Sequence, residues 1–214
     1  MFFEGLSDRV DLRDIGIGEG WLCEAIVTTY HEDGSPNAAP MGVRGGGRDV
    51  VVLKVHRDTD TYENILRGRC CVINIVFDPL LFLRCALYGR HKGPSEIEAG
   101  DVEPADHVDA PYLVGASAYV EAELEEVEDF AKSDAYGMAM GSKMTLRVRD
   151  IRVLSPFPAA PNRGFFAAME LAIALSRGRT EDVPRYMEVI KKTLPEERSL
   201  EIEGFVKGYV RSIS

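Results

Sequence analysis

The stretch Glu24 to Asn74, EAIVTTYHEDGSPNAAPMGVRGGGRDVVVLKVHRDTDTYENILRGRCCVIN, decides the fold of this chain. Its first part is rich in aromatic and β-branched residues up to Tyr30 and runs into the turn sequence Asp33-Gly34. This pattern predicts a strand that enters a hairpin and returns from Asn37 to Arg44. A further strand is predicted from Asp49 to His56, where the apolar run is typical of a strand buried on both faces.

A short helix is predicted next. Asp58 or Thr59 can cap it, because a short side-chain oxygen accepts hydrogen bonds from the unpaired amides of a first helical turn. Leu66 is its expected end and Gly68 its stop signal, and a strand from Arg69 to Val76 follows. Two hairpin strands, a strand, a hydroxyl-rich helix and a strand would form a cradle for a flat, phosphorylated cofactor.

The rest of the chain completes a barrel and then changes character. Tyr112 to Val127 and Lys143 to Leu154 alternate between apolar and polar residues, which predicts two long strands and a barrel of about six strands. After a proline-rich linker, NRGFFAAMELAIALSRG, PRYMEVIKKTL and LEIEGFVKGYVRSI carry apolar residues at helical spacing. The predicted fold class is mainly β with helices: a β-barrel domain over residues 1–155 and a small helical C-terminal domain over residues 156–214.

Composition argues against several classes of function. The 214 residues carry a formal net charge of -10, which disfavours nucleic acid and anionic membranes as partners. No apolar run approaches the ~20 residues that span a bilayer, and the acidic start does not resemble a signal peptide, so we expect a cytoplasmic protein. The cysteines lack CxxC spacing and the histidines form no HxH or HxxxH pair, so we expect reduced thiols and no metal site.

The segment HRDTDTYENI, residues 56–65, offers groups that suit a phosphate. The hydroxyls of Thr59 and Thr61 can donate hydrogen bonds, and the first amides of the helix point outward where the helix dipole favours an anion. Lys54 is close in sequence, and strand alternation places His56 on the same face as Lys54. The alternative, that Thr59 merely caps the helix, stays open.

The segment APMGVR suits the flat part of such a cofactor. Gly42 lacks a Cβ atom, so a planar ring can approach the backbone there, and Pro40 removes an amide at what can be a strand edge. A bulge that serves only the curvature of the barrel explains the same two residues. Both interpretations stay open.

Two longer runs, TTYHEDGSPNAAPMGVR and KVHRDTDTYENILRGRCCVINIVFDP, carry a resemblance to known proteins. They resemble a family of uncharacterised, mostly archaeal proteins with a flavin-binding split-barrel domain and a helical C-terminal domain. More distantly, they resemble the flavin reductases. PNRGFF and MELAIALSRGR are similar to the start of the second domain in that family. The resemblance implies FMN as the cofactor.

The resemblance also implies which residues bind FMN. Lining the isoalloxazine ring are Ala39, Pro40, Met41, Gly42 and Val43. Near the phosphate are Thr59, Thr61 and Asn64, with Lys54 and, by its shared face, His56. Two further candidates are Asn74, which can instead pair with a loop, and Arg163, which can instead brace two domains through a carboxylate.

The implied function is an FMN-binding protein, a flavin-dependent oxidoreductase of the flavin-reductase type with an unknown substrate. The flavin carries the hydride chemistry in such proteins, so no catalytic residue is assigned. The implied partners are NAD(P)H or another electron donor, and a second copy of the chain in a homodimer. The alternative is a noncatalytic flavin carrier or sensor, or a barrel without cofactor that serves as a binding module.

Overall fold

The computed structural model describes residues 10–19, 22–88, 96–134, 137–155 and 163–213. The chain divides into two compact units that interleave along the sequence. The first unit comprises Met1–Asn37, Met41–Val76 and Ala99–Pro156, and the second comprises Ala38–Pro40, Phe77–Glu98 and Phe157–Ser214. The predicted division between residues 155 and 156 lies close to the start of the segment Phe157–Ser214. The segment Phe77–Glu98, in the middle of the chain, also belongs to the second unit.

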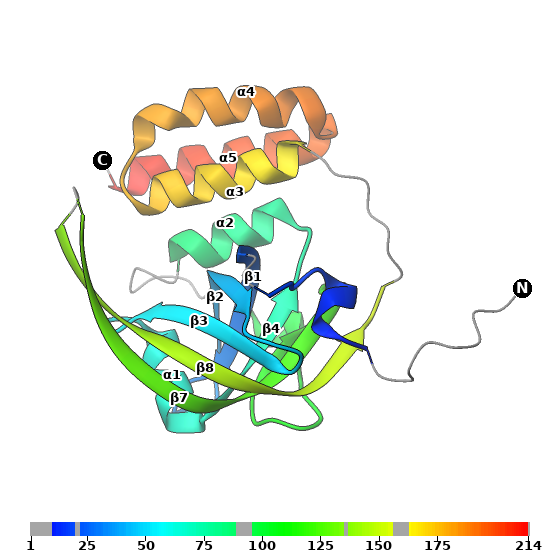
Figure 1. Cartoon of the computed structure of the whole chain (residues 1–214). Helices are drawn as coiled ribbons and strands as arrows, with labels where there is room; N and C mark the ends of the chain where they lie inside the picture. The colour runs from blue at the N-terminus through cyan, green and yellow to red at the C-terminus, as the bar shows by residue number, and fades with distance from the viewer. Residues whose placement is uncertain (1–9, 20–21, 89–95, 135–136, 156–162, 214) are drawn as a thin grey trace, which may run out of the picture. The chain divides into compact units, whose positions relative to one another are not determined.

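Six antiparallel strands close into a barrel, as the sequence predicts (Figure 1). Neighbouring strands follow the order β1-β2-β3-β8-β7-β4, and β4 pairs with β1 to close the ring. The hairpin between the first two strands turns through Gly34 with φ at 81°, a conformation that glycine adopts at little cost. The strands are β1 (Leu22–Tyr30), β2 (Pro36–Gly45), β3 (Val50–His56), β4 (Cys70–Ile75), β7 (Ala118–Asp134) and β8 (Gly137–Val153).

One face of each barrel strand fills the core and the other lies on the outer wall. In β3, Val51, Leu53 and Val55 are buried in the core, whereas Lys54 and His56 are exposed. The expectation that this strand is buried on both faces is therefore wrong. Antiparallel strands commonly have one solvated face, and this strand follows that rule despite its apolar sequence.

The predicted hydroxyl-rich helix is α1 (Asp60–Gly68), and Thr59 is its N-cap. The helix ends differently from the prediction, because Gly68 is its last helical residue and Arg69 takes the left-handed conformation with φ at 58°. That conformation costs a non-glycine residue roughly 1–2 kcal/mol. The Arg69 guanidinium donates a 2.9 Å hydrogen bond to the carbonyl of Leu124, which helps to hold it there.

A two-stranded sheet, β5 (Val102–Pro104) and β6 (Pro111–Leu113), lies between β4 and β7 in the sequence. The loop that joins β5 to β6 packs over the outer wall of the barrel, where Ala110 forms a small hydrophobic cluster with Val72 and Tyr119. Side chains of β7 that face away from the barrel core are thereby covered by this loop.

The second unit is helical. Residues of four of its helices share one hydrophobic core, which includes Leu83, Leu171, Ile190 and Val206. The three helices predicted after residue 156 are confirmed, and a further apolar helix begins after Asp78. Among the helices that the structure describes, none is long and apolar enough to cross a membrane. The elements are α2 (Pro79–Leu87), α3 (Arg163–Ser176), η4 (Thr180–Asp182), α4 (Val183–Thr193) and α5 (Glu196–Ile213); two 3-10 turns, η1 (Leu12–Ile15) and η3 (Ala99–Asp101), belong to the first unit.

Candidate functional site

The ladder between β2 and β3 is short. It runs from the pair Gly45–Val51 to the pair Val43–Leu53, whereas β3 is paired with β8 along its whole length. Gly42 therefore stands one residue beyond the last registered pair. Beyond this point the described part of β2 has no registered partner in β3, so the β2–β3 ladder has an opening at this edge of β2 although the ring of strands is closed.

Strand geometry decides which backbone groups face that opening. The amide of Ala38 donates a 2.9 Å hydrogen bond to Glu96 Oε1. Amides two residues apart point to the same edge of an extended strand, so positions 40 and 42 share this edge. Pro40 has no N–H to offer, which leaves the amide of Gly42 as the next backbone donor along it. The predicted strand-edge role of Pro40 and the predicted close approach at Gly42 thus concern the same edge.

The side chain of Leu22 fills the space beside Gly42. A Cβ atom at this position would lie 2.6 Å from Leu22 Cδ1. Leu22 is 56% exposed, and its isobutyl end can rotate away at little cost. A planar ring can therefore reach the Gly42 backbone once Leu22 moves.

A buried polar network joins β1, β2 and α1. Asn37 Nδ2 lies 3.1 Å from both Thr29 Oγ1 and Thr61 Oγ1, and Asn64 Nδ2 also lies 3.1 Å from Thr29 Oγ1. All four side chains are buried. Arg67 then donates a 2.9 Å hydrogen bond to Asn64 Oδ1. The network brings Thr61 and Asn64, two predicted phosphate residues, together with polar side chains that the sequence analysis did not single out.

This network reaches a cavity of about 390 Å³. Thr29 and Asn64 lie in its wall, and His31 Nδ1 lies 3.4 Å from Asn64 Nδ2. Arg67 and Asp109 add charges of opposite sign to the same wall. The cavity offers polar and charged groups of both signs, so its chemistry suits a polar ligand.

The hydroxyl of Thr59 is fully engaged in the structure. It accepts a hydrogen bond from the Tyr62 amide at 3.3 Å and donates one to the carbonyl of His56 at 2.8 Å. The capping interpretation of Thr59 is therefore observed. In the described part of the chain no acceptor faces the amides of Asp60 and Thr61, which are the first donors of the helix. An anion at this helix end would bind these amides.

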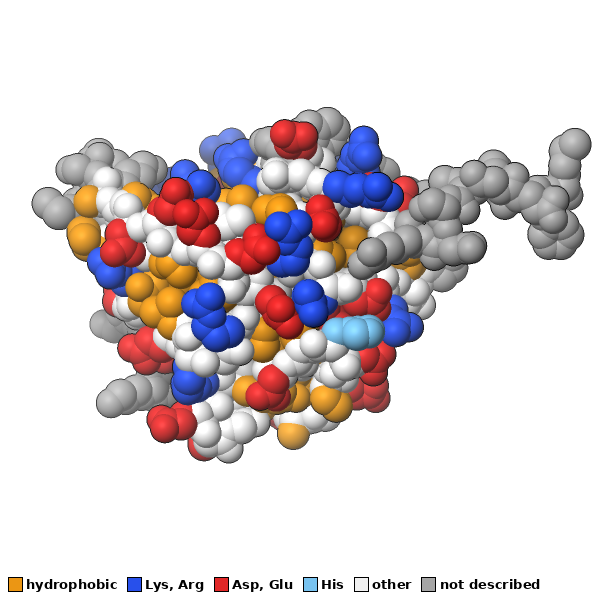
Figure 2. All heavy atoms as spheres, turned by 60° about the horizontal axis from the view of Figure 1, so that its bottom comes forward, with side chains coloured by type: hydrophobic (Ala, Val, Ile, Leu, Met, Phe, Trp, Pro, Cys, Tyr) orange, Lys and Arg blue, Asp and Glu red, His pale blue; other side chains and the backbone are white. Residues whose placement is uncertain are grey.

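Two exposed cations flank the beginning of α1. Lys54 Nζ lies 5.6 Å from the centre of the Phe130 ring, which is a cation–π distance. Arg57 forms a 3.0 Å ion pair with Asp129. Across the face of the molecule shown in Figure 2, acidic and basic side chains are interspersed rather than segregated.

Asn74 is placed in the barrel wall and its amide is occupied. Its Nδ2 donates to the carbonyl of Ile26 at 3.0 Å and to Thr28 Oγ1 at 2.9 Å, while its Oδ1 accepts from the Leu113 amide at 2.8 Å. Arg163 is exposed at the first position of α3, in the second unit. Asn162, which precedes it in the quoted segment PNRGFF, lies outside the described residues. The part of Asn74 and Arg163 in cofactor binding stays a prediction.

Thr29, Asn37 and Arg67 were not predicted from the sequence as site residues. Polar residues inside otherwise apolar strands were the available signal for Thr29 and Asn37, because a buried hydroxyl or amide requires a partner. Arg67 gave no such signal, since an arginine near a helix C-terminus is ordinary.

Three solved structures are similar to this chain in overall fold. The FMN-bound protein MM1853 from Methanosarcina mazei is 25% identical and superposes with a TM-score of 0.75, over 93% of this chain and 100% of that chain. The 2-nitrobenzoate 2-nitroreductase NbaA of Pseudomonas fluorescens is 25% identical, with a TM-score of 0.50 over 72% of this chain and 75% of that chain. A flavin-reductase candidate with a split barrel domain from Shewanella frigidimarina is 20% identical, with a TM-score of 0.50 over 63% and 68%.

These likenesses confirm the predicted fold, a six-stranded split barrel of the flavin-reductase type followed by C-terminal helices. Residues 23–147 match the family described as protein of unknown function (DUF447), N-terminal domain. The match covers more than half of the chain, and MM1853 is assigned to the same family. The chain therefore belongs to the DUF447 family.

Proposed function

We propose that this protein binds FMN and uses it as a flavin-dependent oxidoreductase of the flavin-reductase type. The observation that carries the proposal is the likeness to MM1853, an FMN-bound member of the same family that matches 93% of this chain. A cytoplasmic location, as expected from the sequence, is part of the proposal.

The phosphate of FMN would bind at the beginning of α1. The amides of Asp60 and Thr61 are available there, and the helix dipole favours an anion at this end. The Thr61 hydroxyl accepts a hydrogen bond from Asn37 and keeps its own proton to donate. Lys54 and His56 are exposed on the strand that leads to this helix and would add positive charge or a further donor.

The isoalloxazine ring would lie along residues 39–43 of β2. The opening beyond the Val43–Leu53 pair supplies the backbone edge, and Gly42 supplies room for the ring. Leu22, which closes that room in the structure, would turn aside and cover part of the ring. Such an edge would orient the ring through its polar atoms while its face packs on apolar side chains.

FMN, when bound, supplies the redox chemistry, since it accepts a hydride from a donor such as NAD(P)H and passes the electrons on. The residues of this chain would bind the phosphate, orient the ring and limit the access of water. No side chain is assigned a proton-transfer role. A nicotinamide donor would bind transiently, because the fold contains a barrel in place of a dinucleotide-binding domain.

We also propose that the chain works as a homodimer that shares its flavin sites. The support is the resemblance to split-barrel flavoproteins, in which the flavin lies at the subunit interface. Light scattering of the purified protein with and without FMN tests this part. A monomer at micromolar concentration with FMN bound would contradict it.

One observation favours the second candidate, a barrel that serves as a binding module without cofactor. Leu22 lies over Gly42 and the Thr59 hydroxyl is spent on capping, so two predicted flavin contacts are used by the protein itself. Both contacts are at exposed or half-buried positions. A ligand could therefore displace them, which keeps the FMN proposal ahead.

The deciding experiment begins with the purified protein, whose bound small molecules are released by heat and identified by chromatography. FMN in the released fraction, or binding of added FMN, followed by oxidation of NADH or NADPH with an electron acceptor, supports the oxidoreductase. FMN binding without nicotinamide oxidation favours a carrier or sensor. A protein that neither contains nor binds FMN is a binding module of another kind.

A further inference from the structure

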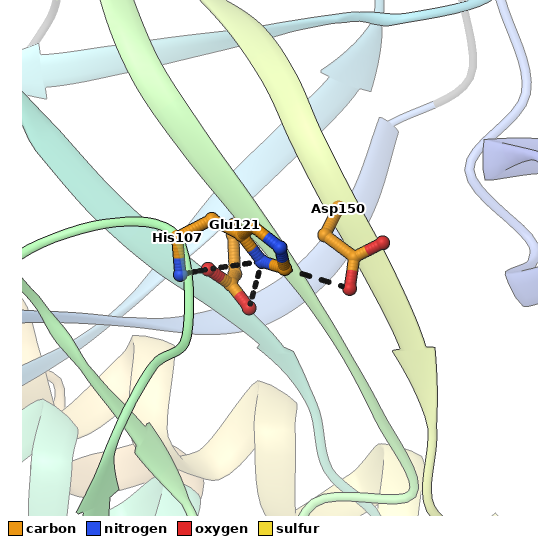
Figure 3. Close-up of side chains that lie close together, drawn as sticks. All are labelled: His107, Glu121 and Asp150. Carbon is orange, nitrogen blue, oxygen red and sulfur yellow. Dashed lines mark hydrogen bonds and ion pairs between the residues drawn. The ribbon is translucent and has the colours of Figure 1, made fainter.

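Three side chains from separate segments meet on the outer wall of the barrel (Figure 3). His107 comes from the loop between β5 and β6, Glu121 from β7 and Asp150 from β8. Glu121 and Asp150 are directly opposite each other in the β7–β8 ladder. Like charges at such positions are destabilising, so this pair calls for a positive partner.

Glu121 is the most unusual member of the group. Its side chain is fully buried, although it faces away from the barrel core, because the β5–β6 loop covers it. A buried carboxylate is costly unless it is paired. Among the residues that the structure describes, no lysine or arginine nitrogen lies within ion-pair distance of Glu121, and its one partner is His107. Within the described residues, the His107 ring is therefore the group best placed to face this buried carboxyl group, together with a cation that both could bind.

The distances within the group fit a metal ion. His107 Nδ1 lies 3.4 Å from Glu121 Oε2 and 3.9 Å from Asp150 Oδ2, and the ligand atoms of the three residues all lie within 4.8 Å of one another. Ligand atoms at about 2.0–2.2 Å from a tetrahedral zinc ion stand about 3.3–3.6 Å apart. Small shifts of Asp150 alone would complete three corners of such a tetrahedron.

The surrounding charges leave room for a divalent cation. Arg152 donates to Asp150 Oδ2 at 2.5 Å and to Asp106 Oδ2 at 3.2 Å. Arg152 thus contacts two of the three carboxylates in this region and leaves Glu121 without a cationic partner among the described arginines and lysines. Three carboxylates against one guanidinium leave an excess of two negative charges when His107 is uncharged. One divalent ion would balance it.

The position is also accessible and held in place. His107 is 48% exposed, and Asp150 lies in the wall of a cavity of about 420 Å³ that Arg152 also lines. The backbone amide of His107 donates a 2.6 Å hydrogen bond to Glu121 Oε2. Hydrogen bonds of this kind orient a ligating carboxylate and tune metal affinity.

We propose that His107, Glu121 and Asp150 bind a divalent transition-metal cation of the zinc class, with water at the remaining position. One imidazole and two carboxylates are ligands that zinc accepts. The ion would tie the β5–β6 loop to β7 and β8. No sequence motif indicates this site, because its three ligands are far apart in the chain and follow no ligand spacing.

The test is a titration of the chelator-treated, full-length protein with Zn²⁺ by calorimetry, with Co²⁺ absorption as a report on ligand geometry. We expect one ion per chain, a micromolar or tighter Kd, and a melting temperature that rises with Zn²⁺ concentration. Loss of a residue that only supports a metal ligand lowers metal affinity by about 10–100-fold. His107→Gln and Asp150→Asn change the ligands themselves, so each should lower the Zn²⁺ affinity by at least about 100-fold. His31→Gln, which removes a histidine elsewhere, is the matched control and should bind Zn²⁺ as the wild type does.

Two outcomes would overturn the proposal. One is a wild-type protein whose melting temperature and heat signal do not respond to Zn²⁺, which would leave a hydrogen-bonded His–Glu pair and no metal site. The other is a folded His107→Gln variant, checked by circular dichroism, that binds Zn²⁺ with wild-type affinity. Neither readout depends on FMN.

Discussion

Asn37 Nδ2 lies 3.1 Å from Thr61 Oγ1, so a side chain of β2 donates a hydrogen bond to the first turn of α1. The same amide also donates to Thr29 at 3.1 Å. The strand proposed to carry the flavin ring and the helix proposed to hold its phosphate are thus linked through a buried contact. Their spacing is set before any ligand binds, which lowers the entropy cost of binding.

Thr61→Val removes the hydroxyl and keeps the shape of the side chain. We expect a stability loss of about 1 kcal/mol, because the Asn37 amide loses one acceptor. FMN affinity should fall by about 10- to 150-fold, since a hydrogen bond to a charged group contributes about 1.5–3 kcal/mol. Denaturant unfolding and an FMN titration measure the two effects. Thr145→Val, the same change at a half-buried position of β8, is the control, and equal FMN affinity in both variants would sink the phosphate assignment.

Gly42→Val tests the position of the ring. The new Cβ atom meets only the flexible, exposed end of Leu22, so we expect the variant to fold with nearly wild-type stability and to lose FMN binding. Thermal melting and flavin fluorescence separate the two properties. Gly115→Val, at a position with open space around it, is the control. If the folded Gly42→Val variant binds FMN with wild-type affinity, the isoalloxazine ring does not lie against this edge of β2.

Lys54→Met tests the charge near the phosphate. Lys54 is exposed, so its contribution is reduced by solvent and amounts to about 1 kcal/mol, or roughly fivefold in FMN affinity. Riboflavin, which lacks the phosphate, should bind both proteins equally. Lys192→Met, at an exposed position of α4, makes the same change in net charge. Equal losses for FMN and riboflavin would show that Lys54 does not act on the phosphate.

Glu203 is expected to make the stability of the helical unit depend on pH. Hydrogen bonds from Lys191 and Lys207, at 2.7 and 2.8 Å, lower the pKa of Glu203 from 4.5 to about 2. A lowered pKa means that the stabilisation is present above pH 4.5 and is lost as the pH falls toward 2. We expect Glu203→Gln to lower the melting temperature at pH 7 and to have a smaller effect near pH 2.

The control for that measurement is Glu188→Gln, which removes a carboxylate from an exposed position of α4. It should shift the melting temperature little at either pH. A Glu203→Gln variant with the same melting profile as wild type from pH 7 to pH 2 would show that the two lysine contacts do not stabilise the unit.

Thiol reactivity tests the burial of the cysteines. Cys71 is fully buried, and burial raises the pKa of its thiol, so it should react only after unfolding. Cys23 is half-buried and should react first. We expect one early thiol with a disulfide reagent in the native protein and all four in guanidinium. Cys23→Ser should remove the early reaction, and persistence of that reaction would contradict this order of burial.

Local patterns predicted the elements well. The β-rich stretch, the Asp33-Gly34 turn and the Thr59 cap are properties of neighbouring residues, and the structure confirms all three. The prediction failed for β3, because an apolar run cannot distinguish a strand covered on two faces from one wall of a barrel. The helix α1 runs to Gly68, two residues beyond its predicted end at Leu66, and the left-handed residue after it is Arg69 in place of the predicted glycine.

Local sequence patterns could not predict contacts between segments that are far apart in the chain. Thr29, Asn37 and Asn64 meet only because β1, β2 and α1 pack together. His107 and Glu121 meet only because the β5–β6 loop covers β7. The residues next to each of these side chains in the sequence do not indicate its contact partner. The partners come together only through the packing of the strands, the helix and the loop.

The most direct test of the central proposal is a titration of FMN with the purified, flavin-free protein, followed by flavin fluorescence at equilibrium. The account predicts saturable binding of one FMN per chain with a micromolar or lower Kd, and weaker binding of riboflavin. FMN fluorescence that stays unchanged at protein concentrations far above micromolar would contradict it.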